Sequence, residues 1–82
     1  MTQIRVDPDL WATSILPEGI LEKWLISDGA FVEQGDKLAT VRIESALHEL
    51  CSPGEGWLTI DRKENSVIEP GAVIGHIGRD QA

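Results

Sequence analysis

The chain has 82 residues, with 7 Lys and Arg against 14 Asp and Glu, and a formal net charge of -7 at pH 7. That length accommodates one small domain with a limited hydrophobic core, and the apolar fraction of 41% is ordinary for a globular chain. The acidic balance excludes a nucleic-acid partner, because binding to a phosphate backbone requires a cationic surface that this composition does not supply.

Cysteine content and the N-terminal segment indicate the compartment. Cys51 is the only cysteine, so no internal disulfide is expected and a reducing cytoplasm is the default. The N-terminus, MTQIRVDPDL, lacks the apolar core of a signal peptide, and no apolar run approaches membrane-spanning length. The chain begins with Met and ends at GRDQA without an Ala/Pro-rich linker, which favours a free-standing protein. We expect a cytoplasmic monomer that does not bind membranes.

Short apolar stretches, separated by turn signals, run along the whole chain and are typical of an all-β sandwich or barrel. The stretches comprise Ile4 with Val6, then 20–26, 31–32, 38–43, 46–50, 57–60, 67–68 and 73–77. The turn signals are DPD at 7–9, PEG at 17–19, SDG at 27–29, QGD at 34–36, SPGEG at 52–56, KEN at 63–65 and EPG at 69–71. The one candidate helix, Gly19 to Ser27, is short, poorly capped and stopped by Asp28-Gly29, so a strand is predicted there.

An internal repeat predicts the architecture. VEQGDKLATV at 32–41 aligns with IEPGAVIGHI at 68–77, and GIL at 19–21 aligns with GWL at 56–58. The same alignment places Gly29 on Asn65, the two residue types that most readily adopt positive φ, so both copies are predicted to make a left-handed turn. We expect one domain, 1–82, with half-repeats at about 19–42 and 56–78 joined by a hairpin at 41–50. Two four-stranded antiparallel sheets related by a pseudo-twofold axis would then bury one face each.

With these motifs the chain resembles the lipoyl/biotinyl-carrier domain family over roughly residues 2 to 78. In the first half, the matching residues are Glu18, Gly19, Trp24, Gly29, Val32, Gly35, Asp36 and Leu38. After the hairpin, they are Ser52, Pro53, Gly56, Ile68, Gly71 and Ile74. The resemblance implies a flattened β-barrel or sandwich of two four-stranded antiparallel sheets, the barrel-sandwich hybrid.

The resemblance also places the family's cofactor-bearing lysine on the hairpin tip, and here that position is Ser45. The family's aspartate falls on Glu44 and its alanine on Ala46. Ser45 has no amine, and no lysine lies between Lys37 and Lys63. We therefore expect no lipoyl or biotinyl cofactor on this chain.

The tip is instead predicted to contact a partner protein, through Ile43, Glu44, Ser45, Ala46 and Leu47. Strand alternation places Leu47 outward beside the turn, on the face opposite to His48. A second feature is the set of acidic residues in the first half, which is either a solvated face or a surface recognised by a basic enzyme. These residues are Glu18, Glu22, Asp28, Glu33 and Asp36.

The sequence disfavours a catalytic triad, a phosphopantetheine attachment site and a metal site. Glu44, Ser45 and His48 have the residue types of a nucleophilic triad, but the serine and histidine are predicted on opposite sides of a tight turn without an oxyanion loop. The ESAL stretch also resembles the serine motif of phosphopantetheine-bearing carriers, which are helical. His48, His76 and Cys51 lack metal-ligand spacing. We expect no catalytic site and no metal, and we expect Trp11 to pack rather than mark a partner site.

Two functions remain open. In the first, the chain is an unmodified relative of the swinging domain of dihydrolipoamide acyltransferase, and docks on a 2-oxo acid dehydrogenase or carboxylase subunit. In the second, it is a stand-alone structural or interaction module that has left carrier chemistry. Neither hypothesis makes the chain itself an enzyme.

Overall fold

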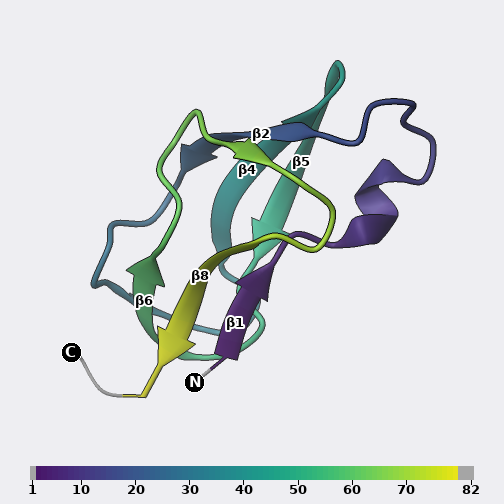
Figure 1. Ribbon diagram of the computed structural model, residues 1–82. Helices are drawn as coiled ribbons and strands as arrows, with labels where there is room; N and C mark the ends of the chain where they lie inside the picture. The colour runs from purple at the N-terminus through teal and green to yellow at the C-terminus, as the bar shows by residue number, and fades with distance from the viewer. Residues whose placement is uncertain (1, 80–82) are drawn as a thin grey trace.

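The computed structural model describes residues 2–79 and consists of two antiparallel sheets packed face to face (Figure 1). The elements are β1 (Thr2–Arg5), the 3-10 helix η1 (Pro8–Trp11), β2 (Gly19–Trp24), β3 (Phe31–Val32), β4 (Lys37–Ile43), β5 (Ala46–Cys51), β6 (Gly56–Ile60), β7 (Val67–Ile68) and β8 (Val73–Gly78). Met1 and residues 80–82, on which the expectation of a free-standing chain depends, lie outside the described residues.

The first sheet has the strand order β1-β8-β6-β3 and the second has the order β5-β4-β2-β7. The predicted fold, two four-stranded antiparallel sheets, is confirmed as a sandwich. The prediction of a strand rather than a helix after Gly19 is also confirmed. The sequence did not predict η1, which begins where the Asp7 side chain accepts a hydrogen bond from the Asp9 amide and proline occupies the first helical turn.

The core lies between the sheets because alternate residues of each strand point inward. Its largest fully buried side chains come from both sheets and from the connections between them: Leu21, Leu38, Leu58, Ile68, Ile74, Val6, Val32 and Val41. Trp11 is also buried, at 7% exposure, so the expectation that this side chain packs is confirmed. Within residues 2–79, no helix has the length and apolar character needed to cross a membrane.

The repeat predicted from the sequence reappears in the strand pairing. Gly19 of β2 pairs with Ile68 of β7, and the equivalent Gly56 of β6 pairs with Val32 of β3. Each glycine therefore lies opposite the aliphatic residue that begins the aligned segment of the other half, Ile68 for Gly19 and Val32 for Gly56. The two halves exchange their short strands, so that β7 of the second half completes the sheet of the first half.

The β4–β5 hairpin projects at one end of the molecule, whereas β1 begins and β8 ends at the other (Figure 1). The shape is elongated, with principal extents of 39 × 20 × 16 Å. The hairpin tip therefore lies at the opposite end of the molecule from the start of β1 and the end of β8, and the paired strands β4 and β5 carry it there.

Candidate functional site

The hairpin tip is a two-residue loop formed by Glu44 and Ser45, closed by the pairing of Ile43 with Ala46. Glu44 has a φ of 55°, in the left-handed region that the favoured two-residue hairpin loops require at their first position. Glycine, asparagine or aspartate normally occupies that position. Here it is a glutamate, so the positive φ could not be predicted from the residue type. Both loop residues are exposed, and the Ser45 side chain is available at the end of the hairpin.

A neighbouring segment is fixed against the tip by the Glu44 carboxylate. This segment, residues 12–18, joins η1 to β2, and we name it the strap. Glu44 Oε1 accepts hydrogen bonds from the Ser14 hydroxyl and from the Ile15 amide, each at 3.2 Å. Glu44 therefore has a structural role at the tip that its position in the sequence did not indicate.

The structure exposes four of the five predicted contact residues and buries the fifth. Glu44, Ser45 and Ala46 are exposed, and Leu47 is 63% exposed, so the predicted outward orientation of Leu47 is confirmed. Ile43 is only 3% exposed and belongs to the core. Its side chain supports the hairpin from inside and is not presented to a partner.

The triad residue types do not form a triad. A small cleft of about 130 Å³ beside the tip is lined by Glu44, Ser45 and His48, among others. However, Glu44 is occupied by the strap, and among residues 2–79 no hydrogen bond joins His48 to Ser45 or to Glu44. The cleft is smaller than the roughly 300–1,000 Å³ of typical ligand sites. It offers no arrangement for nucleophilic catalysis.

The candidate metal ligands are separated by the fold. His48 lies on β5 and His76 on β8, in different sheets. His76 Nδ1 lies 3.0 Å from Asp61 Oδ2, so its ring already has a local carboxylate partner. Cys51 is exposed at the end of β5.

Several of the acidic residues of the first half stabilise turns and strands. Asp36 accepts a hydrogen bond from the Glu33 amide at 2.8 Å, and Asp28 accepts one from the Ile60 amide at 2.9 Å. Glu22 pairs with Arg42 at 3.1 Å on the outer face of the second sheet. These carboxylates therefore have local structural roles, and a surface recognised by a basic partner stays a prediction.

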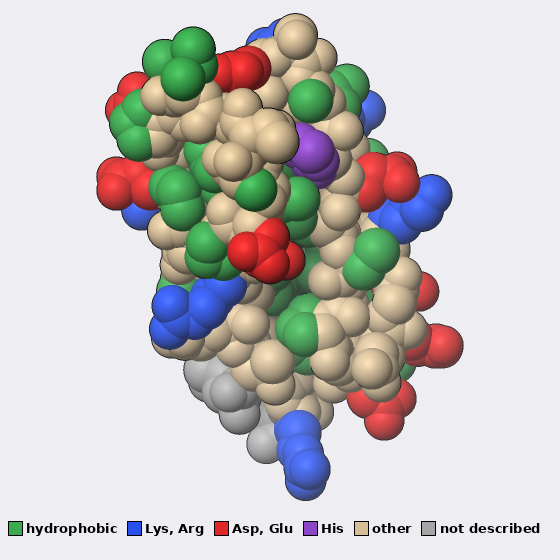
Figure 2. Space-filling model, turned by 90° about the vertical axis from the view of Figure 1, so that its right-hand side faces the viewer, with side chains coloured by type: hydrophobic (Ala, Val, Ile, Leu, Met, Phe, Trp, Pro, Cys, Tyr) green, Lys and Arg blue, Asp and Glu red, His purple; other side chains and the backbone are tan. Residues whose placement is uncertain are grey.

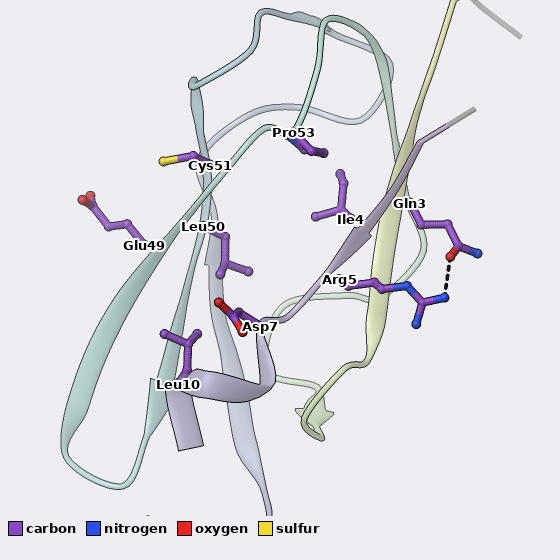
Figure 3. A pocket seen from close by; sticks show the side chains of 9 residues that line it. All are labelled: Gln3, Ile4, Arg5, Asp7, Leu10, Glu49, Leu50, Cys51 and Pro53. Carbon is purple, nitrogen blue, oxygen red and sulfur yellow. Dashed lines mark hydrogen bonds between the residues drawn. The ribbon is translucent and has the colours of Figure 1, made fainter. Parts of the chain in front are cut away.

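A larger cleft of about 480 Å³ lies between the outer strands β1 and β5. Figure 2 shows hydrophobic side chains at the bottom of a hollow on this side of the molecule, with charged side chains around it. Ile4, Leu10 and Leu50 point into the space between the strands (Figure 3). The side chains of Arg5 and Glu49 point away from it, whereas the Asp7 carboxylate lies beside Leu50 and already accepts the Asp9 amide at 2.9 Å (Figure 3). The cleft therefore presents one carboxylate and not a set of converging polar groups.

A groove that the sequence analysis did not identify lies beside the tip, on the outer face of the second sheet. Leu16 of the strap, Ile20 of β2 and Val67 of β7 contribute its apolar lining. The missing information was the pairing of β2 with β7, which are more than forty positions apart in the chain and share no local pattern. The sequence offered only strand alternation, which places Ile20 and Val67 on the face opposite to their buried neighbours Leu21 and Ile68.

Comparison with known proteins shows a similarity to a carboxylase. No family model matches the chain. The chain is similar to an acetyl-CoA carboxylase from Dictyostelium discoideum, with 31% identity over 71 residues. The similar segment is 87% of this chain but 3% of that protein, so the chain spans a very small part of the length of the curated relative that it matches.

Proposed function

We propose that this chain is a lipoyl/biotinyl-domain-like module that bears no cofactor, is not an enzyme, and acts in the cytoplasm by docking on a partner protein. The observation that carries the proposal is Ser45 at the exposed end of a supported hairpin. The motif resemblance assigns that position to the lysine of a carrier domain, and a serine hydroxyl cannot form the amide that attaches lipoate or biotin. Without a cofactor, the hairpin still presents an exposed tip that a partner protein can contact.

The partner system is supported in part by the similarity to a carboxylase. Of the two systems that the motifs allow, this favours a carboxylase-type assembly. A relation to dihydrolipoamide acyltransferase stays a prediction from the motifs alone. A docking role also agrees with the β1–β5 cleft, from which the Arg5 and Glu49 side chains point away. It agrees with the tip cleft as well, because there the Glu44 carboxylate binds the strap.

The first experiment is the intact mass of the chain purified from its native host. We expect the mass of the unmodified polypeptide. An added lipoyl, biotinyl or phosphopantetheinyl mass would overturn the proposal, and peptide mapping would then identify the modified residue.

A second experiment tests the ancestry of the tip. We expect Ser45→Lys to become a substrate of a biotinyl or lipoyl ligase, because the loop already presents this position at the hairpin end. Leu47→Lys is the matched control, since it places a lysine on the same exposed hairpin two positions later. Modification of neither variant, with both folded, would count against descent from a carrier domain.

A further inference from the structure

A row of side chains crosses the outer face of the second sheet from one edge to the other. The strand register aligns Leu47 of β5 with Arg42 of β4, Arg42 with Ile20 of β2, and Ile20 with Val67 of β7. Leu47 is 63% exposed and Val67 is 50% exposed. Cross-strand neighbours on one face are in contact, so these residues form a continuous band rather than isolated exposed positions.

At the β7 end of this row, the band deepens into a groove of about 250 Å³. Leu16, 55% exposed, forms the wall on the strap side, and Ile20 and Val67 form the sheet side. The hydrogen bonds from Ser14 and Ile15 to Glu44 fix the strap, so the wall is held in place. The volume is below the roughly 300–1,000 Å³ of small-molecule sites, and it suits one apolar side chain of a partner.

The charged side chains that line the groove are two carboxylates and one guanidinium, and the Arg62 guanidinium lies close by, where it donates to the Val67 carbonyl at 3.3 Å. Glu18 and Glu44 line it directly. Arg42 is the one cation in the lining, and Glu22 neutralises it at 3.1 Å, which leaves the aliphatic stem of Arg42 to cover the row. An apolar pocket inside an acidic rim is complementary to an apolar anchor flanked by lysine or arginine. A second copy fits poorly, because each chain has a net charge of -7.

We propose that this groove binds a basic segment of a partner protein, with one large apolar side chain inserted between Leu16 and Val67. The inference rests on the proposed docking function and adds a surface to it. The tip residues then form one side of the contact and the groove forms its anchor.

The probe for this proposal is a short synthetic peptide with a central leucine flanked on both sides by lysine and arginine. Titration into the isotope-labelled full chain is followed by amide chemical shifts. We expect shifts centred on Leu16, Ile20 and Val67. A peptide with serine in place of leucine should bind at least about tenfold more weakly, and one with glutamate in place of the basic residues should not bind. Added salt should weaken the binding.

Two variants of the strap distinguish a specific groove from general apolar adhesion. Leu16→Ser should weaken binding of the leucine peptide about tenfold or more, because it removes one wall. Ile15→Ser is the matched control: Ile15 is more exposed, at 93%, but does not line the groove. Equal losses in both variants, absence of binding, or equal binding of the serine peptide would overturn the proposal. Self-association at high concentration that Leu16→Ser abolishes would assign the groove to a second copy and overturn it as well.

The outcomes separate this inference from the proposed function. A cofactor found by mass on the native chain would refute the proposed function, but it would not change the outcome of the peptide titration. Conversely, an unmodified mass together with a failure to bind the peptide would refute the groove as an anchor. The proposal that the chain docks through its tip would then still stand.

Discussion

Gly29 and Asn65 occupy equivalent turns in the two halves of the molecule, and both have positive φ, of 87° and 68°. The turn in the first half delivers the Gly29 amide to the Leu58 carbonyl at 2.7 Å, and the turn in the second delivers the Asn65 amide to the Leu21 carbonyl at 2.7 Å. Leu21 and Leu58 are themselves equivalent in the repeat. Each turn therefore binds the central strand of the other half, which explains why both require a left-handed residue.

Asn65 provides a direct test of this requirement. Asn65→Ala should lower the free energy of unfolding by about 1 kcal/mol, because alanine tolerates positive φ less well than asparagine does. Asn65→Gly should change it by less than about 0.5 kcal/mol, since relief of backbone strain is offset by greater freedom of the unfolded chain. Chemical denaturation of both variants measures the difference. Equal stability of the alanine variant and the natural chain would refute a left-handed turn at this position.

Gly56 is expected to be the least replaceable glycine of the chain. Its φ is 149°, and a Cβ there would overlap the Gly78 carbonyl oxygen and lie 2.7 Å from Ile77 Cγ2. Gly56→Ala should cost about 1–3 kcal/mol from overpacking of the β6–β8 pair, with further strain from the backbone. Gly54→Ala is the control, because nothing lies within 4 Å of its Cβ position. Thermal unfolding of the two variants tests this, and similar losses in both would contradict the packing argument.

Glu44 should control the mobility of the strap with little effect on global stability. Glu44→Gly relieves the positive φ of 55° but removes the acceptor for the Ile15 amide. We expect exchange of the Ile15 amide hydrogen to accelerate about tenfold in this variant, corresponding to the loss of one hydrogen bond to a charged acceptor. Glu44→Gln retains an acceptor oxygen at the same reach and should show a much smaller change. Unchanged exchange in Glu44→Gly would mean that other contacts hold the strap.

The fold could be predicted because its signals are local and repeated. The alternation in 41–50 gave the outward position of Leu47, and the aligned Gly29 and Asn65 gave both left-handed turns. The two-sheet arrangement followed from the count of short strands and the repeat. These features depend on neighbouring residues or on a pattern that occurs twice.

The strap and the groove could not be predicted because they depend on contacts between distant segments. Nothing in the sequence around Glu44 indicates that its carboxylate binds Ser14 and Ile15, some thirty positions earlier. Likewise, Val67 becomes a neighbour of Ile20 only through the exchange of short strands between halves. Such contacts have no periodicity and no motif, and only the assembled fold brings them together.

The two buried tryptophans differ in how their indole N–H groups are satisfied, and this predicts unequal costs of substitution. Trp24 Nε1 donates to the Arg62 carbonyl at 2.8 Å. Trp11 Nε1 is buried, and within residues 2–79 it has no hydrogen-bond partner. Trp→Phe removes similar apolar area at both sites, but at Trp24 it also breaks a hydrogen bond, whereas at Trp11 it removes an unsatisfied donor.

We therefore expect Trp24→Phe to lower the free energy of unfolding by about 1 kcal/mol more than Trp11→Phe does. Denaturation with urea, monitored by circular dichroism rather than by tryptophan fluorescence, measures both variants with the same probe. The double variant tests independence, and its cost should be close to the sum of the single costs. An equal or larger cost for Trp11→Phe would show that the Trp11 N–H is satisfied after all, for instance by a buried water molecule.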